Sequence, residues 1–242
     1  MKQLEIDAGN TFVKWRLRNA DEAIDEGRLQ TAQVRDGRAE VPLGWSQAEQ
    51  ARVASVAGDL VNGWLSDVLA DLGTPVDFAQ VSMQRHGLKN AYENPQQMGV
   101  DRWVAMLAAW QQTRKGVCVV DAGSAVTVDF VDATGQHLGG YILPGLRLLQ
   151  ESLLGSTAGV RWAALPDSSS LQPGNSTAAC VHNGGHYLLA ALLQRVKSDC
   201  ECYAIDQIIL TGGDAAELQH QTRIGQLQPA LVLDGLRWLG ED

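Results

Sequence analysis

Hydrophobic and polar residues alternate in two short stretches that lie in opposite halves of the chain. The first, LEIDAGNT at residues 4–11, has its counterpart in CVVDAGSA at residues 118–125. Each stretch leads into a second run with period-two alternation, at residues 12–18 and 126–132, which is typical of a strand. After turn residues, third strands are expected at residues 27–29 and 138–143. The pattern predicts two β-meander halves that repeat each other.

The segment between the two halves follows a βαβ pattern. Residues 52–57 and 76–81 are predicted as strands, and residues 59–72 between them are predicted as an amphipathic helix. A second helix is predicted over residues 99–114, where apolar residues point in nearly every direction. We expect this helix to be buried between layers and to bridge the halves. Its apolar residues include Trp103, Val104, Met106, Leu107 and Trp110.

The second half continues with helices. Pro144-Gly145 begins a helix that extends to about residue 154, and residues 176–196 form another. Residues 207–210 are predicted as a strand that ends at the segment TGGD. We place the domain boundary near Lys115, with one domain at residues 1–114 and the other at residues 115–242. Residues 35–50 show little periodicity and are expected to be loop or short helix.

Composition limits the partners that the chain can have. Hydrophobic residues make up 45% of its 242 positions, which is enough to build a substantial core. The formal net charge of −9 argues against sequence-independent binding of nucleic acid, where Lys and Arg must neutralise phosphates. An anionic ligand must therefore be bound by groups at the site itself, such as backbone N–H groups, a few basic side chains or a bound cation.

Neither a secretion signal nor a membrane span is visible in the sequence. Charged residues interrupt the N-terminal segment, and no run of about 18 apolar residues occurs. We expect a cytoplasmic protein without membrane association. The cysteines form neither a Cys-x-x-Cys pair nor a paired zinc spacing, so we expect free thiols at Cys118, Cys180, Cys200 and Cys202.

The duplicated Asp-Ala-Gly segment points to phosphate binding. Glycine after a strand-terminal Asp admits close approach of a phosphate, and the hairpin N–H groups with the hydroxyl of Thr11 can donate to its oxygens. Asp7 can hold a magnesium ion directly or through water. One such segment alone is usually a turn, but a second at residues 121–124 could grip the same polyphosphate. The chain has no Gly-x-x-x-x-Gly-Lys-Ser/Thr run, which leaves the twin hairpins as the candidates.

Five segments together resemble the type III pantothenate kinases. They are DAGNTFVKW at residues 7–15, GVDRW at 99–103, DAGSAVT at 121–127, GGYILPG at 139–145 and TGGDA at 211–215, in the family's order. Glycine-rich hairpins occur across the actin-like superfamily, whereas Gly-x-Asp-Arg-Trp is more particular to this family. The resemblance spans nearly the whole chain. It implies an α/β fold of two ribonuclease H-like, actin-like ATPase lobes with mixed β-sheets, related by internal duplication.

The resemblance also implies an activity. Members transfer phosphate from ATP to the primary hydroxyl of pantothenate, the first step toward coenzyme A, as homodimers that use Mg²⁺ and a monovalent cation, K⁺ or NH₄⁺. By resemblance, Asp101 is the catalytic base and Asp121 lies at the monovalent-cation site. The ATP contacts implied are Asp7, Ala8, Gly9, Asn10, Thr11, Phe12, Val13, Lys14 and Ser124. The pantothenate contacts implied are Tyr92, Gly99, Val100, Asp101, Arg102 and Thr177.

Two departures from the family pattern affect these assignments. Ser124 stands where the family usually has Thr, so the hydroxyl donor is kept but its positioning is open. The match is also weaker around residues 175–185, which bears on Thr177.

Several of these residues have simpler interpretations. Asp101 also fits a helix N-terminal cap, and Arg102 also fits a surface ion pair. Tyr92 could merely pack on its loop. Cys180 and His182, at positions i and i+2 of a helix, do not share a face, which disfavours a metal site with His186.

The function and the assembly have alternatives too. Another small-molecule kinase of the superfamily would share the ATP site, and a nucleotide-binding regulatory protein would lack turnover. The wide apolar content of residues 99–114 suggests a two-fold homodimer, although an ordinary interior would give the same pattern.

Overall fold

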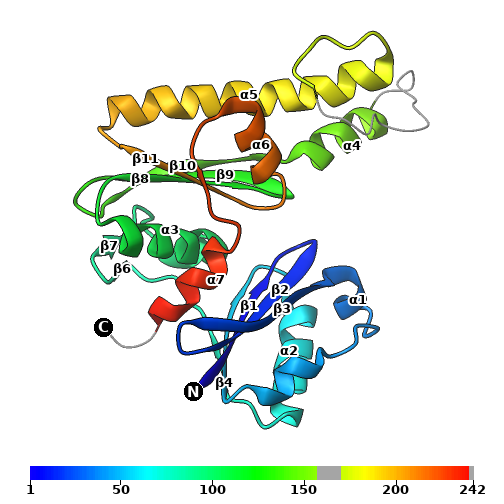
Figure 1. The fold of residues 1–242 in the computed structure, drawn as a ribbon, viewed down its shortest axis with the longest axis vertical. Helices are drawn as coiled ribbons and strands as arrows, with labels where there is room; N and C mark the ends of the chain where they lie inside the picture. Colours follow the sequence, from blue (N-terminus) through cyan, green and yellow to red (C-terminus); the bar gives the residue numbers. More distant parts are fainter. Residues whose placement is uncertain (157–169, 240–242) are drawn as a thin grey trace. The chain divides into compact units, whose positions relative to one another are not determined.

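The computed structural model describes residues 1–156 and 170–239, which form two compact units (Figure 1). The first unit contains residues 1–112 and the C-terminal segment from Ala230 onward, and the second contains residues 113–229. The change of unit near Thr113 lies close to the expected boundary at Lys115. The C-terminal segment differs from the expected division, because it belongs to the first unit rather than the second.

The first unit is built on a five-stranded mixed sheet with the order β3-β2-β1-β4-β5. Strands β1, β2 and β3 are antiparallel neighbours, whereas β4 and β5 run parallel to β1. The strands are β1 (Lys2–Ala8), β2 (Phe12–Asn19), β3 (Glu22–Gln30), β4 (Gln50–Ser55) and β5 (Val76–Phe78). The helical elements between them are α1 (Thr31–Arg35), the 3₁₀ helix η1 (Leu43–Gln47) and α2 (Asp59–Asp71). The predicted βαβ segment is thus present.

One face of this sheet is apolar because the apolar residues of β1 lie opposite apolar residues of β2 in the strand register. Leu4, Ile6 and Ala8 of β1 are fully buried, as are Val61, Leu65 and Leu69, which recur every four residues along α2. These residues belong to one core cluster. Burial of this kind contributes roughly 25 cal/mol per Å² of apolar surface. The indole rings of Trp15, Trp45 and Trp64 close the core edge to face, with centroid separations of 6.3 and 6.1 Å.

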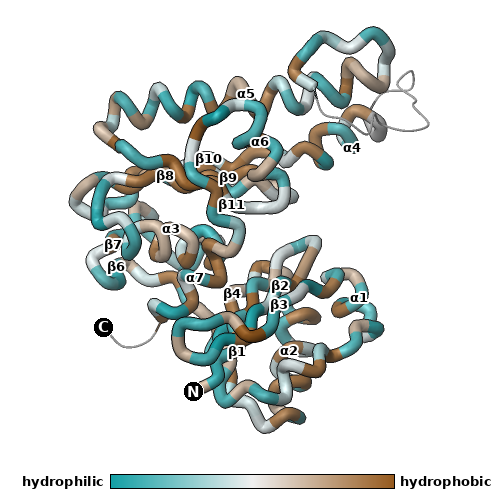
Figure 2. The backbone as a smooth tube through the Cα atoms, viewed as in Figure 1, coloured by the Kyte–Doolittle hydropathy of each residue, from teal (hydrophilic) through white to brown (hydrophobic). Residues whose placement is uncertain are grey.

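The second unit repeats the same sheet, in the order β10-β9-β8-β11-β12 and with the same strand directions. Its strands are β8 (Val117–Ala122), β9 (Ala125–Val131), β10 (His137–Pro144), β11 (Gln207–Thr211) and β12 (Gln226–Leu227). Its helices are α4 (Leu146–Ser156), α5 (Thr177–Cys202) and α6 (Ala215–Thr222). β8 and β9 are largely hydrophobic (Figure 2) and pack with buried residues of α5 such as Leu189 and Leu193. The predicted internal duplication is confirmed.

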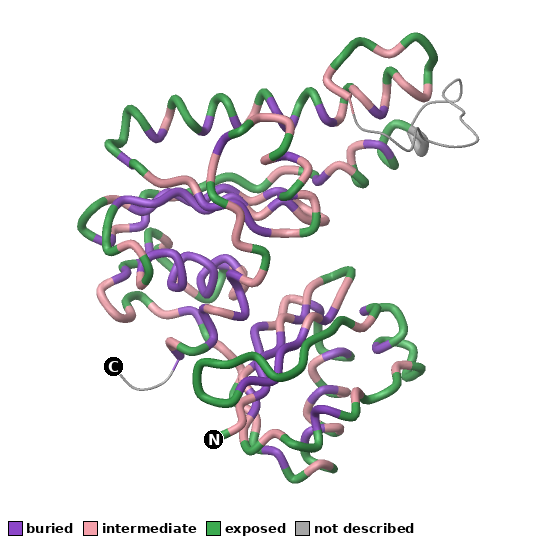
Figure 3. The backbone as a smooth tube through the Cα atoms, in the orientation of Figure 1, coloured by how far each residue is buried: buried purple, intermediate pink, exposed green. Residues whose placement is uncertain are grey.

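The remaining elements of the first unit follow β5 or close the chain. They are β6 (Gln84–Arg85), β7 (Leu88–Lys89), the 3₁₀ helix η2 (Pro95–Gln97), α3 (Val100–Thr113), α7 (Leu231–Leu236) and the 3₁₀ helix η3 (Arg237–Leu239). The predicted burial of α3 is confirmed, because every residue from Arg102 to Trp110 is at most 6% exposed (Figure 3). The single chain therefore already covers this helix. Its expected position as a bridge between the halves stays a prediction.

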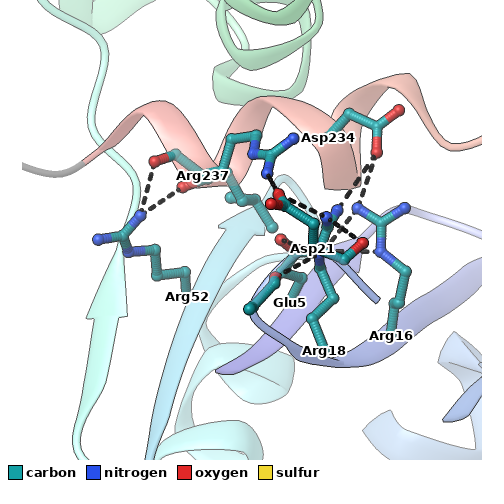
Figure 4. Close-up of polar contacts among 9 residues, drawn as sticks. Glu5, Arg16, Arg18, Asp21, Arg52, Asp234 and Arg237 are labelled. Carbon is teal, nitrogen blue, oxygen red and sulfur yellow. Dashed lines mark hydrogen bonds and ion pairs between the residues drawn. The ribbon is translucent and has the colours of Figure 1, made fainter. Parts of the chain in front are cut away.

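The other face of the first sheet carries a buried charge cluster, which we define as Glu5, Arg16, Arg18 and Asp234 (Figure 4). Glu5 of β1 lies opposite Arg16 of β2, and Arg16 Nε donates to Glu5 Oε2 over 2.7 Å. Arg16 Nη2 also lies 2.8 Å from Asp234 Oδ1. Burial raises the pKa of Glu5, and the charge and hydrogen bond of Arg16 oppose that rise.

Removal of one partner should reveal what the pair contributes. Arg16→Met is expected to lower the free energy of unfolding by about 3 kcal/mol, because Glu5 stays buried without its main counter-charge. The folded-state pKa of Glu5 would then rise further above its unfolded value. Stability linked to a raised pKa is present at low pH and lost as the pH rises through the folded pKa. The penalty measured by urea unfolding should therefore be larger at pH 8 than at pH 5.

The matched control is the double variant Glu5→Gln/Arg16→Met, which removes both charges. We expect it to regain at least about 1 kcal/mol relative to Arg16→Met at pH 8, since no uncompensated carboxylate remains. A single variant as stable as the double variant, or a penalty independent of pH, would contradict this account.

Candidate active site

The first phosphate hairpin joins β1 to β2. Asp7 lies opposite Lys14 in the register, and both side chains are half-buried at the end of the sheet. The Gly9 N–H donates to the carbonyl of Phe12 over 3.0 Å and closes the turn. Buried Thr31, the first residue of α1, donates from its hydroxyl to the Gly9 carbonyl over 2.8 Å and from its N–H to Thr11 over 3.0 Å. This anchor for the hairpin was not predicted from the sequence.

The second hairpin joins β8 to β9 and is one residue shorter. Here Ala122 pairs with Val126, whereas Ala8 pairs with Val13 in the first hairpin. The Gly123 N–H accordingly donates to the carbonyl of Ala125 over 3.0 Å, one position earlier than in the first turn. The two Asp-Ala-Gly segments therefore match in β1 and β8, but the strands that follow are offset by one residue.

Two glycine segments of the second unit pack on this hairpin. The Gly145 N–H donates to the Ser124 carbonyl over 3.1 Å, and a Cβ on Gly145 would overlap the Gly123 carbonyl oxygen. Gly212, at φ +95°, leaves no room for a Cβ beside the Asp121 carboxylate. The Asp214 N–H donates to the Ala122 carbonyl over 2.8 Å. The structure thus brings together three motifs that the sequence singled out at residues 121–127, 139–145 and 211–215.

The candidate acceptor residues of the first unit also converge. Arg102, which is 6% exposed, donates from Nη1 to the Tyr92 hydroxyl over 3.0 Å. The Tyr92 N–H donates to Oδ1 of Asn90 over 2.9 Å, and Asn90 is itself buried. Asp101 Oδ1 accepts from the Arg102 N–H over 2.8 Å and lies where a Cβ on Gly99 would stand. Asn90 was not predicted from the sequence as the support for Tyr92.

These contacts bear on the alternatives for three residues. Arg102 is buried, so an exposed surface ion pair does not describe it. Tyr92 does more than pack on its own loop, because its hydroxyl contacts Arg102. Asp101, the second residue of α3, accepts from the adjacent N–H, so it satisfies a donor of the first helical turn and its catalytic role stays open.

Thr177 lies apart from these residues, in the second unit. It is the exposed first residue of α5, whose N-cap Ser176 accepts from the Ala179 N–H over 3.2 Å. Thr177 lines a largely apolar cavity of about 850 Å³ between α4 and α5. The cavity is lined also by Leu149, Leu153, Val181 and Leu188. Because Tyr92 and residues 99–102 belong to the first unit, a shared pantothenate site with Thr177 stays a prediction.

The rings of His182 and His186 in α5 meet edge to face with a centroid separation of 4.8 Å. Burial and the neighbouring His182 lower the pKa of His186. Within the described ranges, no group of three His, Cys, Asp or Glu residues is placed to hold a metal ion. In the same part of the chain, no helix has both the length and the apolar character that a membrane span requires.

Comparisons with known proteins identify the relatives of this arrangement. The sequence profile of the family described as type III pantothenate kinase matches residues 3–199. The chain belongs to the type III pantothenate kinase family. A type III pantothenate kinase of Marinobacter nauticus is 41% identical over 238 residues, which cover 96% of each chain.

The fold of this chain is also similar to that of solved structures. A putative Baf family transcriptional activator from Campylobacter jejuni aligns with a TM-score of 0.58 and 19% identity, covering 97% of this chain and 95% of that one. A ROK family glucokinase from Streptomyces griseus aligns with a TM-score of 0.54 and 10% identity, covering 98% of each. At these identities the likeness concerns the fold alone, and it agrees with the expected fold of two α/β lobes.

Proposed function

We propose that this protein transfers the γ-phosphoryl group of ATP to the primary hydroxyl of pantothenate, giving 4′-phosphopantothenate for coenzyme A biosynthesis. The observation that carries the proposal is membership of the type III pantothenate kinase family over most of the chain, together with two Asp-Ala-Gly hairpins on equivalent sheets. Because the net charge of −9 repels ATP, local donors and cations must hold its phosphates.

In this proposal the first hairpin, from Asp7 to Lys14, and Ser124 of the second bind the phosphates. Their glycines permit close approach, and Lys14 adds a positive charge opposite Asp7. The carboxylate of Asp7 suits Mg²⁺, directly or through water, since hard cations prefer oxygen ligands. Asp121, beside Gly212, is assigned to the monovalent cation, K⁺ or NH₄⁺. When bound, the cations neutralise charge on the transferring phosphoryl group.

The acceptor side is assigned to Tyr92, residues 99–102 and Thr177. The buried guanidinium of Arg102, bonded to Tyr92, suits the carboxylate of pantothenate. The pantothenate hydroxyl oxygen forms a bond to the γ-phosphorus as the bond to the β,γ-bridging oxygen breaks, and ADP leaves. Asp101 accepts the proton that the hydroxyl loses. Catalysis in such transfers comes mainly from positioning and charge stabilisation.

The proposed function is tested by ADP release from ATP and Mg²⁺, measured with and without pantothenate and with a panel of hexoses in its place. We expect release that depends on pantothenate and not on a hexose. Release with a hexose alone would indicate another kinase of the superfamily. ATP binding without turnover on any acceptor would favour a regulatory protein.

Asp101→Asn separates a catalytic base from a helix cap. We expect kcat to fall by about 10²- to 10⁴-fold with the KM for pantothenate largely kept, because Asn cannot accept the proton. The amide oxygen still accepts from the Arg102 N–H, so the stability should change by only a few tenths of a kcal/mol. Steady-state kinetics and urea unfolding measure the two effects. A variant that keeps more than about a third of the parental kcat would rule out the base, since that ratio leaves under 1 kcal/mol for the carboxylate.

Activity should also require a monovalent cation. We expect turnover in potassium or ammonium buffers with saturating Mg²⁺ and poor turnover in sodium, because Asp121 and the phosphates crowd negative charge into one region. Initial rates at constant ionic strength measure this. Equal rates in sodium and potassium would count directly against the cation site at Asp121.

We include a homodimer in the proposal. Its support comes from exposed apolar side chains of the second unit, and not from residues 99–114. The buried α3 is ordinary interior, so it no longer supports dimerisation. Exposed large apolar side chains on β10, α4 and α5 take its place, and such surfaces often mark an interface. They include Ile142, Leu148, Leu153, Tyr187 and Leu188. Sedimentation equilibrium at micromolar concentration should give twice the 26.1 kDa chain mass, and a mass of one chain would contradict the dimer.

A further inference from the structure

The short C-terminal helix α7 contacts the strands that carry the first phosphate hairpin. Its Asp234 Oδ1 lies 2.8 Å from Arg16 Nη2 and 4.0 Å from Arg18 Nη1 (Figure 4). Arg16 bonds Glu5 across β1 and β2. Because side chains alternate along a strand, Glu5 shares a face with Asp7, two residues further along β1. Asp234 is therefore connected to the face of the sheet that presents Asp7.

The next residue of α7 contacts the helix that begins with the acceptor residues. A Cβ on Gly235 would overlap the backbone carbonyl oxygen of Val104 in α3, so only glycine permits this approach. Val104 follows Asp101 by three residues, about one helical turn. A displacement of α7 relative to Val104 would therefore shift the helical turn that contains Asp101.

The C-terminal end of this segment is fixed by basic side chains. The last carbonyls of a helix lack partners within it, and cations near them are favourable. Arg52 Nη1 donates to the carbonyls of Leu236 and Arg237 over 3.0 and 2.9 Å. Beyond them, His86 Nε2 lies 3.0 Å from the Trp238 carbonyl oxygen.

His86 also joins this end of the segment to α3. Its own carbonyl accepts from Trp110 Nε1 over 3.2 Å and from Gln111 Nε2 over 3.0 Å. The neighbouring Arg85 donates from Nη1 to the carbonyl of Leu239 over 2.5 Å. The C-terminal segment is thus held by the sheet, by the β6–β7 turn and by α3.

We propose that α7 is a positioning element for phosphoryl transfer, with Asp234 and Gly235 as positioning residues that set the separation between the Asp7 hairpin and Asp101. The inference rests on the proposed function. The contacts of Asp234 hold the phosphate-binding strands, and the close approach of Gly235 holds the acceptor helix. Neither residue belongs to the sites assigned to ATP or pantothenate, so both act through other residues.

This arrangement has a kinetic signature. Displacing α7 shifts the two groups of residues relative to each other but leaves the contacts within each group in place. Each substrate should then bind with nearly its parental KM, while kcat falls because a misplacement of about 1 Å can cost about 10²-fold. A residue with a merely structural role would lower stability without this separation of kcat from KM.

Gly235→Ala tests the helix contact, with Gly63→Ala as its matched control. Gly63 lies in α2 of the same unit and has open space where a Cβ would stand. We expect Gly235→Ala to lower kcat at least ten-fold, with both KM values within about two-fold of the parent. Gly63→Ala should keep the parental kcat. Rates are divided by the folded fraction that unfolding curves give at the assay temperature.

Asp234→Asn is the milder variant if Gly235→Ala fails to fold, and exposed Asp67→Asn in α2 is its control. We expect a three- to ten-fold loss of kcat, KM values near those of the parent, and partial recovery in Asp234→Glu, which restores the charge. Parental kcat in both Asp234→Asn and Gly235→Ala, or a loss confined to KM, would overturn the positioning role. A parent chain without pantothenate-dependent turnover would instead refute the proposed function.

Discussion

The ion pair between Glu5 and Arg16 is the constraint on which the first unit depends. Glu5 is 1% exposed and Arg16 is 7% exposed, and a charge buried to this degree costs several kcal/mol unless it is paired and hydrogen-bonded. Two guanidinium groups on β2 and one carboxylate on β1 would leave an excess positive charge. Asp234 supplies a second negative charge beside Arg16, and exposed Asp21 lies 3.7 Å from Arg18. The contact of Asp234 with Arg16 is one of those that join the segment from Ala230 onward to the first unit, although in sequence it follows the second.

The repeat of the fold does not extend to this charge cluster. By strand register, the position of Arg16 in β2 corresponds to Asp129 in β9. Asp129 lies opposite Val119 in β8, at the position that Glu5 has in the first unit. Its Oδ1 lies 3.0 Å from His137 Nε2 in β10 instead. The same sheet therefore uses its central polar position in two ways, and in the first unit this position is linked to the C-terminal helix.

Sequence reasoning succeeded where the signal was local. Alternation in β1, β2, β8 and β9 predicted the paired hairpins, and the apolar character of α3 predicted its burial. β3 extends over Glu22–Gln30, well beyond the expected residues 27–29, because an exposed edge strand needs no apolar alternation once its backbone pairs with β2 (Figure 3). The shorter turn of the second hairpin could not be predicted either, because both hairpins begin with the same sequence, Asp-Ala-Gly.

Two supports of the candidate site could not be predicted because they depend on contacts between residues far apart in sequence. Thr31 contacts the first hairpin 22 residues away. Asp234 contacts Arg16 although the whole second unit lies between them in the sequence. Asn90 lies close to Tyr92 in sequence, and it is its burial that the sequence pattern did not reveal. Sequence patterns indicated the candidate site residues, whereas long-range polar contacts help to determine where those residues are held.

The acidic character of both hairpins explains why positioning matters for this chemistry. Asp7 and Asp121 each end a strand where phosphate oxygens are proposed to bind, and carboxylates repel phosphate unless cations lie between them. A site of this kind binds its anion only when carboxylates, cations and backbone donors are held at suitable separations. Loops alone hold such separations poorly, whereas strand ends and packed helices hold them well. The buried charge cluster thus fixes β1, the strand from which Asp7 is proposed to reach the phosphates.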